Sequence, residues 1–174
     1  MSIMANIRMH LSGLTNFSGR ETRVMFWPWV GLAFGLAMAT NVLLMTQLVM
    51  PAVLIADVAE EIVAAMRSYA MAMGIVASIT VALLAAAVVR RLHDAGQPVW
   101  IGLVPLPFLA FGLIWFIRVM SLAFVVEEVD SGFTAAFALG FLNNLIYLAT
   151  LVFLVVCLAR RSEPQENRHG PQPG

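Results

Sequence analysis

The chain has 174 residues, of which 61% are hydrophobic and only 11% are charged. Soluble domains are nearer half apolar and a quarter charged, so this composition excludes an ordinary soluble fold and favours a membrane protein. Ten basic residues balance ten acidic residues, and this zero net charge gives no reason to expect a nucleic-acid partner. The single cysteine, Cys157, excludes an intrachain disulfide.

The first sixteen residues predict a short amphipathic helix that lies in the membrane interface. Its apolar side chains recur at the spacing of one helix face: Ile3, Ile7, Leu11 and Leu14. Arg8 and His10 fall off that face. The alternative interpretation of residues 1–16 is a frayed N-terminal tail.

Four apolar stretches follow, and each is long enough for the ~20 residues that a membrane-spanning helix needs. They cover roughly residues 27–50, 70–89, 99–118 and 134–158. Together they leave no room for a separate soluble domain. We therefore predict an all-α polytopic membrane protein with four transmembrane helices, in a single membrane domain over residues 1–174.

The ends of these stretches carry further signals. Ser18, with Glu21 three residues later, matches a capping box and predicts that the first long helix begins at Gly19. The mixed segment 51–69 fits either a loop or an interfacial helix. The polar segment 162–174, rich in Pro, Gln and Gly, predicts a disordered tail.

Several residues within the spans predict how the helices pack. Gly31 and Gly35 form a G-x-x-x-G pair, which would let a second helix approach closely. Pro105 and Pro107 remove backbone donors and predict a kink in the third span. Two amides are expected to form interhelical hydrogen bonds: Asn41 and Asn143. Cys157 is expected to be a small buried hydrophobe.

The arginines predict the orientation in the membrane. Eight of the ten belong to one set of span ends: Arg8, Arg20, Arg23, Arg90, Arg91, Arg160, Arg161 and Arg168. The opposite ends carry only Arg67 and Arg118, with six of the ten acids. Because basic residues stay on the cytoplasmic side, we predict a multi-pass protein of the bacterial inner (plasma) membrane with both termini in the cytoplasm.

Three short segments resemble domain-of-unknown-function family 805, a family of small bacterial inner-membrane proteins. Residues 17–23 read F-S-G-R-E-T-R and precede Phe26-Trp27, residues 90–96 read R-R-L-H-D-A-G, and residues 167–170 read N-R-H-G. His169 stands where the family has Tyr, the usual Pro-Gly before that tail motif is missing, and Q-P-V-W at 97–100 replaces the usual Ser-Gly-Trp-Trp. The resemblance implies a four-helix membrane fold and supplies no established activity.

The predicted topology brings the start of the first long helix and the loop after the second to one membrane surface. The candidate site residues there are Arg20, Arg23, Arg90, Arg91, His93 and Asp94. Such arginines could hold anionic phospholipid headgroups or the acidic segment of a membrane-protein partner. Alternatively, they set the orientation, and Arg–Asp pairs hold the loop in place.

We expect no catalytic, metal-binding or cofactor-binding residues. Adjacent His93 and Asp94 lack the further ligands that a metal site needs, and a hydrogen bond that braces the loop is the favoured role for this pair. The primary functional hypothesis is a non-enzymatic accessory, scaffold or regulatory subunit, which could form a homo-oligomer. The alternatives are a small oligomeric transporter or channel, supported by the Pro105/Pro107 break and the Asn143-Asn144 pair, and a lipid-modifying enzyme that uses His93 and Asp94.

Overall fold

The computed structural model describes residues 2–56, 58–125 and 131–171, and every regular element in these ranges is a helix. The elements are, in chain order, α1 (Ile3–Ser12), α2 (Arg23–Leu44), the π-helix η1 (Met45–Val49), α3 (Met50–Ile55), α4 (Ala59–Asp94), the 3₁₀ helix η2 (Val99–Leu103), α5 (Leu106–Val125) and α6 (Ser131–Ala159). Four of the acids counted at the opposite span ends lie outside the described residues: Asp57, Glu127, Glu128 and Asp130.

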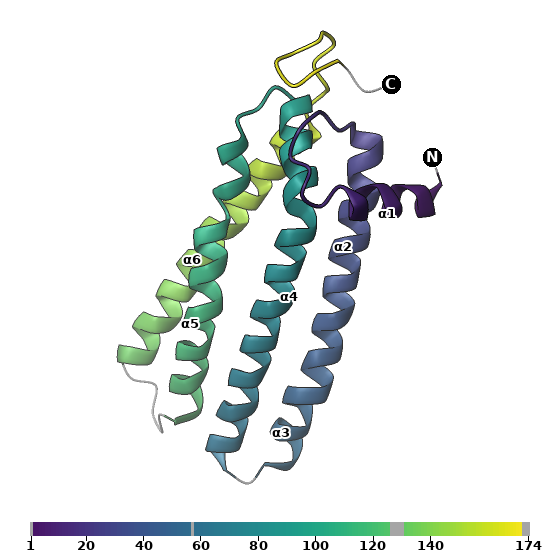
Figure 1. Cartoon of the computed structure of the whole chain (residues 1–174). Helices are drawn as coiled ribbons and strands as arrows, with labels where there is room; N and C mark the ends of the chain where they lie inside the picture. Colours follow the sequence, from purple (N-terminus) through teal and green to yellow (C-terminus); the bar gives the residue numbers. More distant parts are fainter. Residues whose placement is uncertain (1, 57, 126–130, 172–174) are drawn as a thin grey trace. The chain divides into compact units, whose positions relative to one another are not determined.

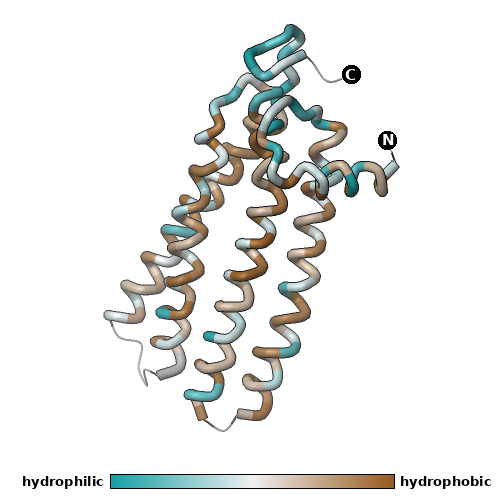
Figure 2. The backbone as a smooth tube through the Cα atoms, in the orientation of Figure 1, coloured by the Kyte–Doolittle hydropathy of each residue, from teal (hydrophilic) through white to brown (hydrophobic). Residues whose placement is uncertain are grey.

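Four helical stretches are long and apolar enough to cross a membrane: Arg23–Ile55, Ala59–Asp94, Val99–Ala123 and Ser131–Ala159. Figure 2 shows hydrophobic residues along α2, α4, α5 and α6 and hydrophilic residues in the tail after α6. The prediction of an all-α protein with four membrane-spanning helices is therefore confirmed.

The helices extend beyond the predicted apolar stretches. α4 has 36 residues, and at 1.5 Å per residue it is about 54 Å long, well over the ~30 Å of a bilayer core. Residues 59–69, left open as loop or interfacial helix, form its first turns, with Glu60 and Glu61 at the N-terminus, where helix dipoles favour acidic residues.

The predicted start of the first long helix at Gly19 is wrong. α2 begins at Arg23, and Gly19 has a φ of 86°, which does not occur in an α-helix. The capping box does not form because the Glu21 side chain bonds to His10 and Arg90 instead. The Ser18 backbone N–H donates to the side chain of Asn16.

The contacts divide the chain into two compact units, each built from pieces of the long helices. The first unit comprises Met1–Ala37, Ser78–Pro105 and Thr150–Gly174, and the second comprises Met38–Ala77 and Leu106–Ala149. Both chain ends therefore belong to the first unit. That the whole chain is a single domain stays a prediction.

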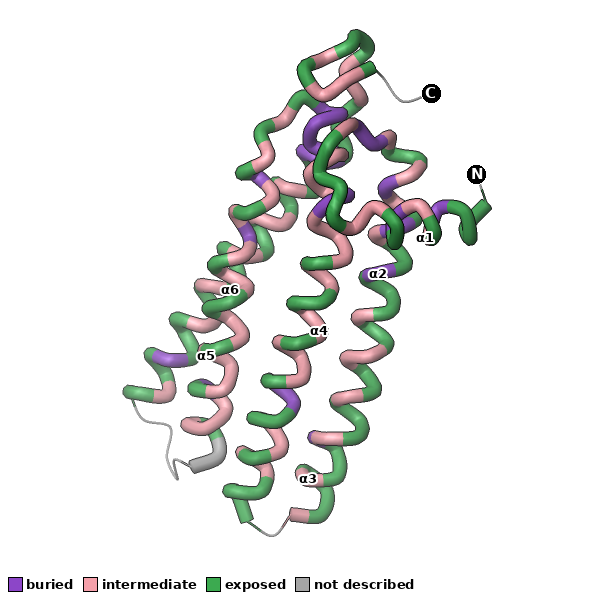
Figure 3. The backbone as a smooth tube through the Cα atoms, in the orientation of Figure 1, coloured by how far each residue is buried: buried purple, intermediate pink, exposed green. Residues whose placement is uncertain are grey.

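The first unit has a hydrophobic core that brings together α2, α4, η2 and α6. Its buried members are Phe26, Trp29, Ala87, Leu92, Ile101, Cys157 and Leu158. Cys157 is buried, as predicted. The indole N–H of Trp29 donates to the carbonyl of Leu83 at 3.1 Å, which ties α2 to α4 beside this core. Figure 3 shows that the buried residues of this unit concentrate at the C-terminal end of α4 and in the segment before α2.

Polar contacts join helices within the second unit. The Tyr69 hydroxyl donates to Oδ1 of Asn41 at 2.5 Å, and the Asn143 amide donates to the Phe108 carbonyl at 3.0 Å. Both asparagines therefore form the interhelical hydrogen bonds that the sequence predicts. The indole N–H of Trp115 donates to the carbonyl of Ala136 at 2.8 Å.

Glycines permit close packing at other positions than the predicted pair. A Cβ at Gly31 or Gly35 would meet no described atom within 4 Å, so the expectation of a helix packed against them is wrong for the described chain. In the second unit, a Cβ at Gly140 would lie 3.0 Å from Cδ1 of Trp115. The third span changes helix type at the predicted prolines: the 3₁₀ helix η2 ends at Leu103, and α5 begins at Leu106 with Pro107 in its first turn, where no N–H is needed. The kink itself stays a prediction.

Replacing Gly140 with leucine should lower the thermal stability of the detergent-purified protein, because the new side chain must displace the Trp115 ring from its bond to Ala136. We expect a loss of about 1–3 kcal/mol, typical of overpacking. Gly31→Leu is the matched control, since residue 31 has open space. Equal melting temperatures for the two variants would contradict the packing described for Gly140.

Candidate functional site

The C-terminal end of α4 is shaped by a glycine turn. Gly96 has a φ of 63°, its N–H donates to the His93 carbonyl at 3.2 Å, and the N–H of Gln97 donates to the Leu92 carbonyl at 2.8 Å. This pair of bonds is a Schellman motif, which satisfies the last carbonyls of a helix. The Glu163 side chain fills the place that a Cβ of residue 96 would take, so glycine is required there for space as well as for φ.

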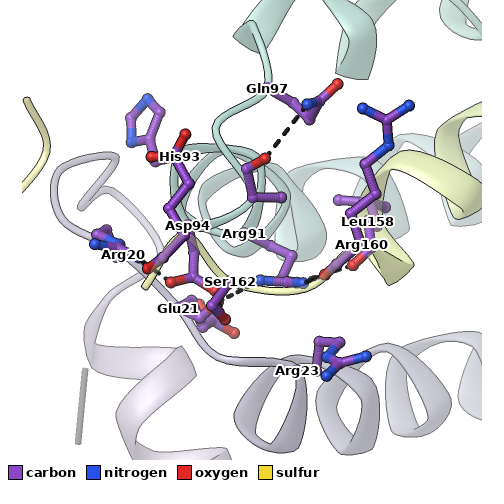
Figure 4. Close-up of polar contacts among 12 residues, drawn as sticks. Arg20, Glu21, Arg23, Arg91, His93, Asp94, Gln97, Leu158, Arg160 and Ser162 are labelled. Atoms are coloured by element: carbon purple, nitrogen blue, oxygen red, sulfur yellow. Dashed lines mark hydrogen bonds and ion pairs between the residues drawn. The ribbon is translucent and has the colours of Figure 1, made fainter. Parts of the chain in front are cut away.

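Asp94 lies just before this turn and is completely buried. Its Oδ1 accepts from Nε of Arg20 at 3.1 Å, and its Oδ2 accepts from Arg91 and from the hydroxyl of Ser162. Arg91 is buried as completely, and Arg20 is 9% exposed. Figure 4 shows the Asp94 carboxylate between side chains from the segment before α2, from α4 itself and from the tail after α6.

A second buried carboxylate, Glu21, lies in the same unit. Its Oε2 accepts from Nε and Nη2 of Arg90 at 2.9 and 2.8 Å, and its Oε1 lies 2.7 Å from Nε2 of His10. The other ring nitrogen of His10 lies 2.9 Å from the Asn6 carbonyl. Since a carbonyl oxygen only accepts, Nδ1 of His10 donates to Asn6. The His10 ring also stacks on Trp29, with centroids 4.9 Å apart.

We call these six residues the polar cluster: His10, Arg20, Glu21, Arg90, Arg91 and Asp94. Its arginines also donate to backbone carbonyls far away in the sequence. Arg91 donates from Nε to the carbonyl of Leu158 at 2.8 Å, in the last turn of α6, whose carbonyls have no partner within the helix. Arg90 donates to the Gly13 carbonyl at 3.1 Å, at the C-terminal end of α1. The cluster therefore holds α1, α4 and α6 together.

The sequence predicts a disordered tail after α6. In the structure this tail is instead bound to the polar cluster. Arg20 donates from Nη2 to the carbonyl of Glu163 at 2.6 Å and from Nη1 to that of Gln165 at 2.9 Å. Asn167 forms an isolated antiparallel β-bridge with Gly170, and its side-chain amide donates to the His93 carbonyl at 3.1 Å. Figure 1 shows the tail beside the end of α4. Residues 172–174 of the predicted tail lie outside the described residues.

Two histidines stack where the tail meets α4. The rings of His93 and His169 are 3.5 Å apart and within 8° of parallel, and Nδ1 of His93 donates to the Gly19 carbonyl at 3.1 Å. The expectation that His93 braces the loop is thus confirmed. Burial, with repulsion from His93 and Arg168, lowers the pKa of His169, so its ring stacks in the neutral form near neutral pH.

The structure brings five of the six candidate residues together, but mostly as partners of one another. Four are buried: Arg20, Arg91, His93 and Asp94. Arg90 is partly buried against Glu21, and only Arg23 is exposed, with its Nη1 3.5 Å from the Ala159 carbonyl. This geometry favours the structural alternative, in which Arg–Asp pairs hold the loop, over direct headgroup binding by the buried members.

Sequence reasoning missed His10, Glu21, Ser162 and Asn167. Glu21 lies within the F-S-G-R-E-T-R motif, but we assigned it to the capping box. Asn167 begins the N-R-H-G motif, which marked the residue as important but did not indicate its role. His10 and Ser162 stand in no motif. In the described residues, no group of three or more His, Cys, Asp or Glu side chains is arranged to hold a metal ion.

Replacing Asp94 with asparagine should strongly destabilise the protein, because two buried arginines would lose their shared carboxylate. We expect a loss of about 3–5 kcal/mol and faster proteolysis of the tail. Glu166→Gln, in the exposed part of the tail, is the control and should behave as wild type. Thermal unfolding in detergent and timed digestion would measure both effects, and an unchanged melting temperature for Asp94→Asn would contradict the role given to the cluster.

The comparisons with known proteins address the family. A model of the family described as "Protein of unknown function (DUF805)" matches residues 14–171, a range that includes all three motifs quoted above. A search of curated proteins and a search of solved structures each found no match. The chain therefore belongs to this family of proteins of unknown function, DUF805.

Proposed function

We propose that this multi-pass membrane protein is a non-enzymatic accessory, scaffold or regulatory subunit of the bacterial inner membrane, and that its exposed arginines bind anionic phospholipid headgroups. The single observation that carries the proposal is the division of the arginines of the first unit. Arg20 and Arg91 are buried against Asp94, whereas five others have exposed side chains: Arg8, Arg23, Arg160, Arg161 and Arg168.

The charge of these five exposed arginines is available to a partner. In the part of the chain that the structure describes, none of them forms an ion pair with an acidic side chain. Arginine suits a phosphate partner because its planar guanidinium donates two parallel hydrogen bonds. A lipid headgroup supplies such a phosphate at the depth where a transmembrane helix leaves the bilayer.

The N-terminal helix supports the same role. α1 buries the polar side chains of Asn6 and His10 against the protein, while the apolar side chains of Ile3, Met4 and Leu11 are more than half exposed. A helix with an exposed apolar face next to arginines fits the boundary between acyl chains and headgroups. The helix α1 therefore has exposed apolar residues that support the proposed place in the interface.

The arginine distribution also supports termini in the cytoplasm. All eight arginines of the predicted cytoplasmic set belong to the first unit, with both chain ends, and Arg67 and Arg118 belong to the second. Because basic residues are retained on the cytoplasmic side, this distribution supports termini in the cytoplasm.

The two alternatives have weaker support. A lipid-modifying enzyme would need an accessible acid or base, but Asp94 is fully buried with donors on both oxygens. A transporter could use the groove of about 520 Å³ in the second unit. Its lining contains no Asp, Glu, Lys, Arg or His, whereas ion and proton pathways usually carry ionisable groups within the membrane.

The headgroup site is tested by the triple variant Arg23→Gln/Arg160→Gln/Arg161→Gln, at the neighbouring ends of α2 and α6. Native mass spectrometry with phosphatidylglycerol, cardiolipin and phosphatidylcholine should show selective retention of the anionic lipids by the wild type. The variant should lose about tenfold or more of this retention. Arg67→Gln/Arg118→Gln is the control. Unselective retention by all three proteins would leave the exposed arginines as orientation signals and would contradict the site.

The orientation is tested by labelling single cysteines with a membrane-impermeant maleimide, in a Cys157→Ala background and in intact bacterial cells. Glu60→Cys, at the exposed start of α4, should react in intact cells. Gln165→Cys, in the exposed tail, should react only after lysis. The reverse pattern would place the termini outside the cytoplasm.

A further inference from the structure

Asn144, in the second unit, carries an exposed side-chain amide. Asn144 is the fourteenth of the 29 residues of α6, so it lies at the middle of a membrane-spanning helix. Its side chain is exposed and forms no hydrogen bond with the described residues. Its neighbour Asn143 differs, because that amide donates to the Phe108 carbonyl at 3.0 Å.

An exposed, unpaired amide such as that of Asn144 is destabilising in a membrane but not in water. At mid-depth there is no water to take up the amide N–H₂ and C=O groups, and acyl chains offer neither donors nor acceptors. A polar side chain at this depth is normally paired with another helix. Since no described residue supplies the partner of Asn144, a molecule outside the chain can provide it.

The surroundings of Asn144 form an apolar stripe along α6. Phe137 and Phe141 precede it by two turns and one turn, and Leu148 follows it by one turn, so all three share its helix face. Each of the three is more than half exposed. Phe137 and Phe141 stack on each other with centroids 6.4 Å apart. The stripe is thus a bulky surface with one hydrogen-bonding group at its centre, and Phe137, Phe141 and Asn144 also border the groove of the second unit.

We propose that this stripe is the interface with a second copy of the same chain, and that Asn144 of each copy bonds to Asn144 of the other. A carboxamide is its own complement, since it has a donor group and an acceptor group side by side. A twofold axis along the membrane normal sets the two α6 helices parallel and brings the same residue face to face. Both amides are then satisfied by one symmetric contact.

Other occupants satisfy Asn144 less well. A lipid headgroup carries suitable polar atoms, but it lies at the membrane surface rather than at the middle of α6. A helix of another protein would need its own polar residue at the same depth. The second copy provides that residue without any further condition, and two copies inserted in the same orientation place it at the same depth.

The dimer is tested by Förster resonance energy transfer between labelled copies of the full chain in phosphatidylcholine vesicles. Wild type and Asn144→Gln should dimerise alike, because glutamine keeps the carboxamide, while Asn144→Leu should dimerise about three- to thirty-fold more weakly. Circular dichroism checks that Asn144→Leu remains folded. Equal dimerisation of Asn144→Leu and wild type, or a wild type that stays monomeric at high protein-to-lipid ratios, would overturn the proposal.

Cross-linking gives a second measurement that leaves Asn144 in place. In a Cys157→Ala background, oxidation should join copies that carry Leu148→Cys, one turn from Asn144 on the same face. Ile146→Cys is the matched control at the same depth, because residue 146 is exposed but lies about 200° around the helix from Leu148. Stronger cross-linking through residue 146 than through residue 148 would contradict the proposed interface.

Discussion

The buried ion pairs of Asp94 with Arg20 and Arg91 are the contacts on which the first unit depends. A buried charge is tolerated only when its partners and hydrogen bonds are in place, and here they come from three distant segments: the residues before α2, the end of α4 and the tail after α6. None of these segments can move without leaving a charge unpaired. The pairs therefore fix one arrangement of the segments, while the hydrophobic core around Phe26, Leu92 and Cys157 supplies the apolar contacts beside it.

This constraint changes how the arginines of the protein should be interpreted. A count by side of the membrane treats all eight alike, but the structure separates them into two groups. Arg20, Arg90 and Arg91 donate hydrogen bonds to carboxylates and to backbone carbonyls at helix ends and in the tail. The exposed arginines, such as Arg23 and Arg160, face outward with their charge unpaired in the described chain. Only the second group can bind a phosphate without first disrupting the fold, so the binding role that we propose falls to exposed arginines, most of which stand outside the family motifs.

The sequence predicted the fold better than the site, for a physical reason. A membrane span is a local property of about twenty residues, so hydropathy located all four helices. The motif residues Arg20, Arg91 and Asp94 were expected near one another at one membrane surface, and the structure brings them into contact. Their mutual burial was not predictable, because Arg20 bonds to residues more than seventy positions away. The order of the tail was not predictable for the same reason. The tail is polar and forms no core of its own, and its contacts are made to the distant residues Arg20 and His93.

The second unit differs from the first, because its helices are built mainly from apolar side chains and no buried ion pair joins them in the described residues. Within a bilayer, lipid competes with protein for apolar surface, so polar contacts and close packing must hold the helices together. Tyr69 with Asn41, and Trp115 with Ala136, are contacts of this kind. By the same condition a polar side chain left over at mid-depth marks an incomplete assembly. Asn144 is such a side chain in the described chain, and in the dimer that we propose it gains its missing contact from a second copy.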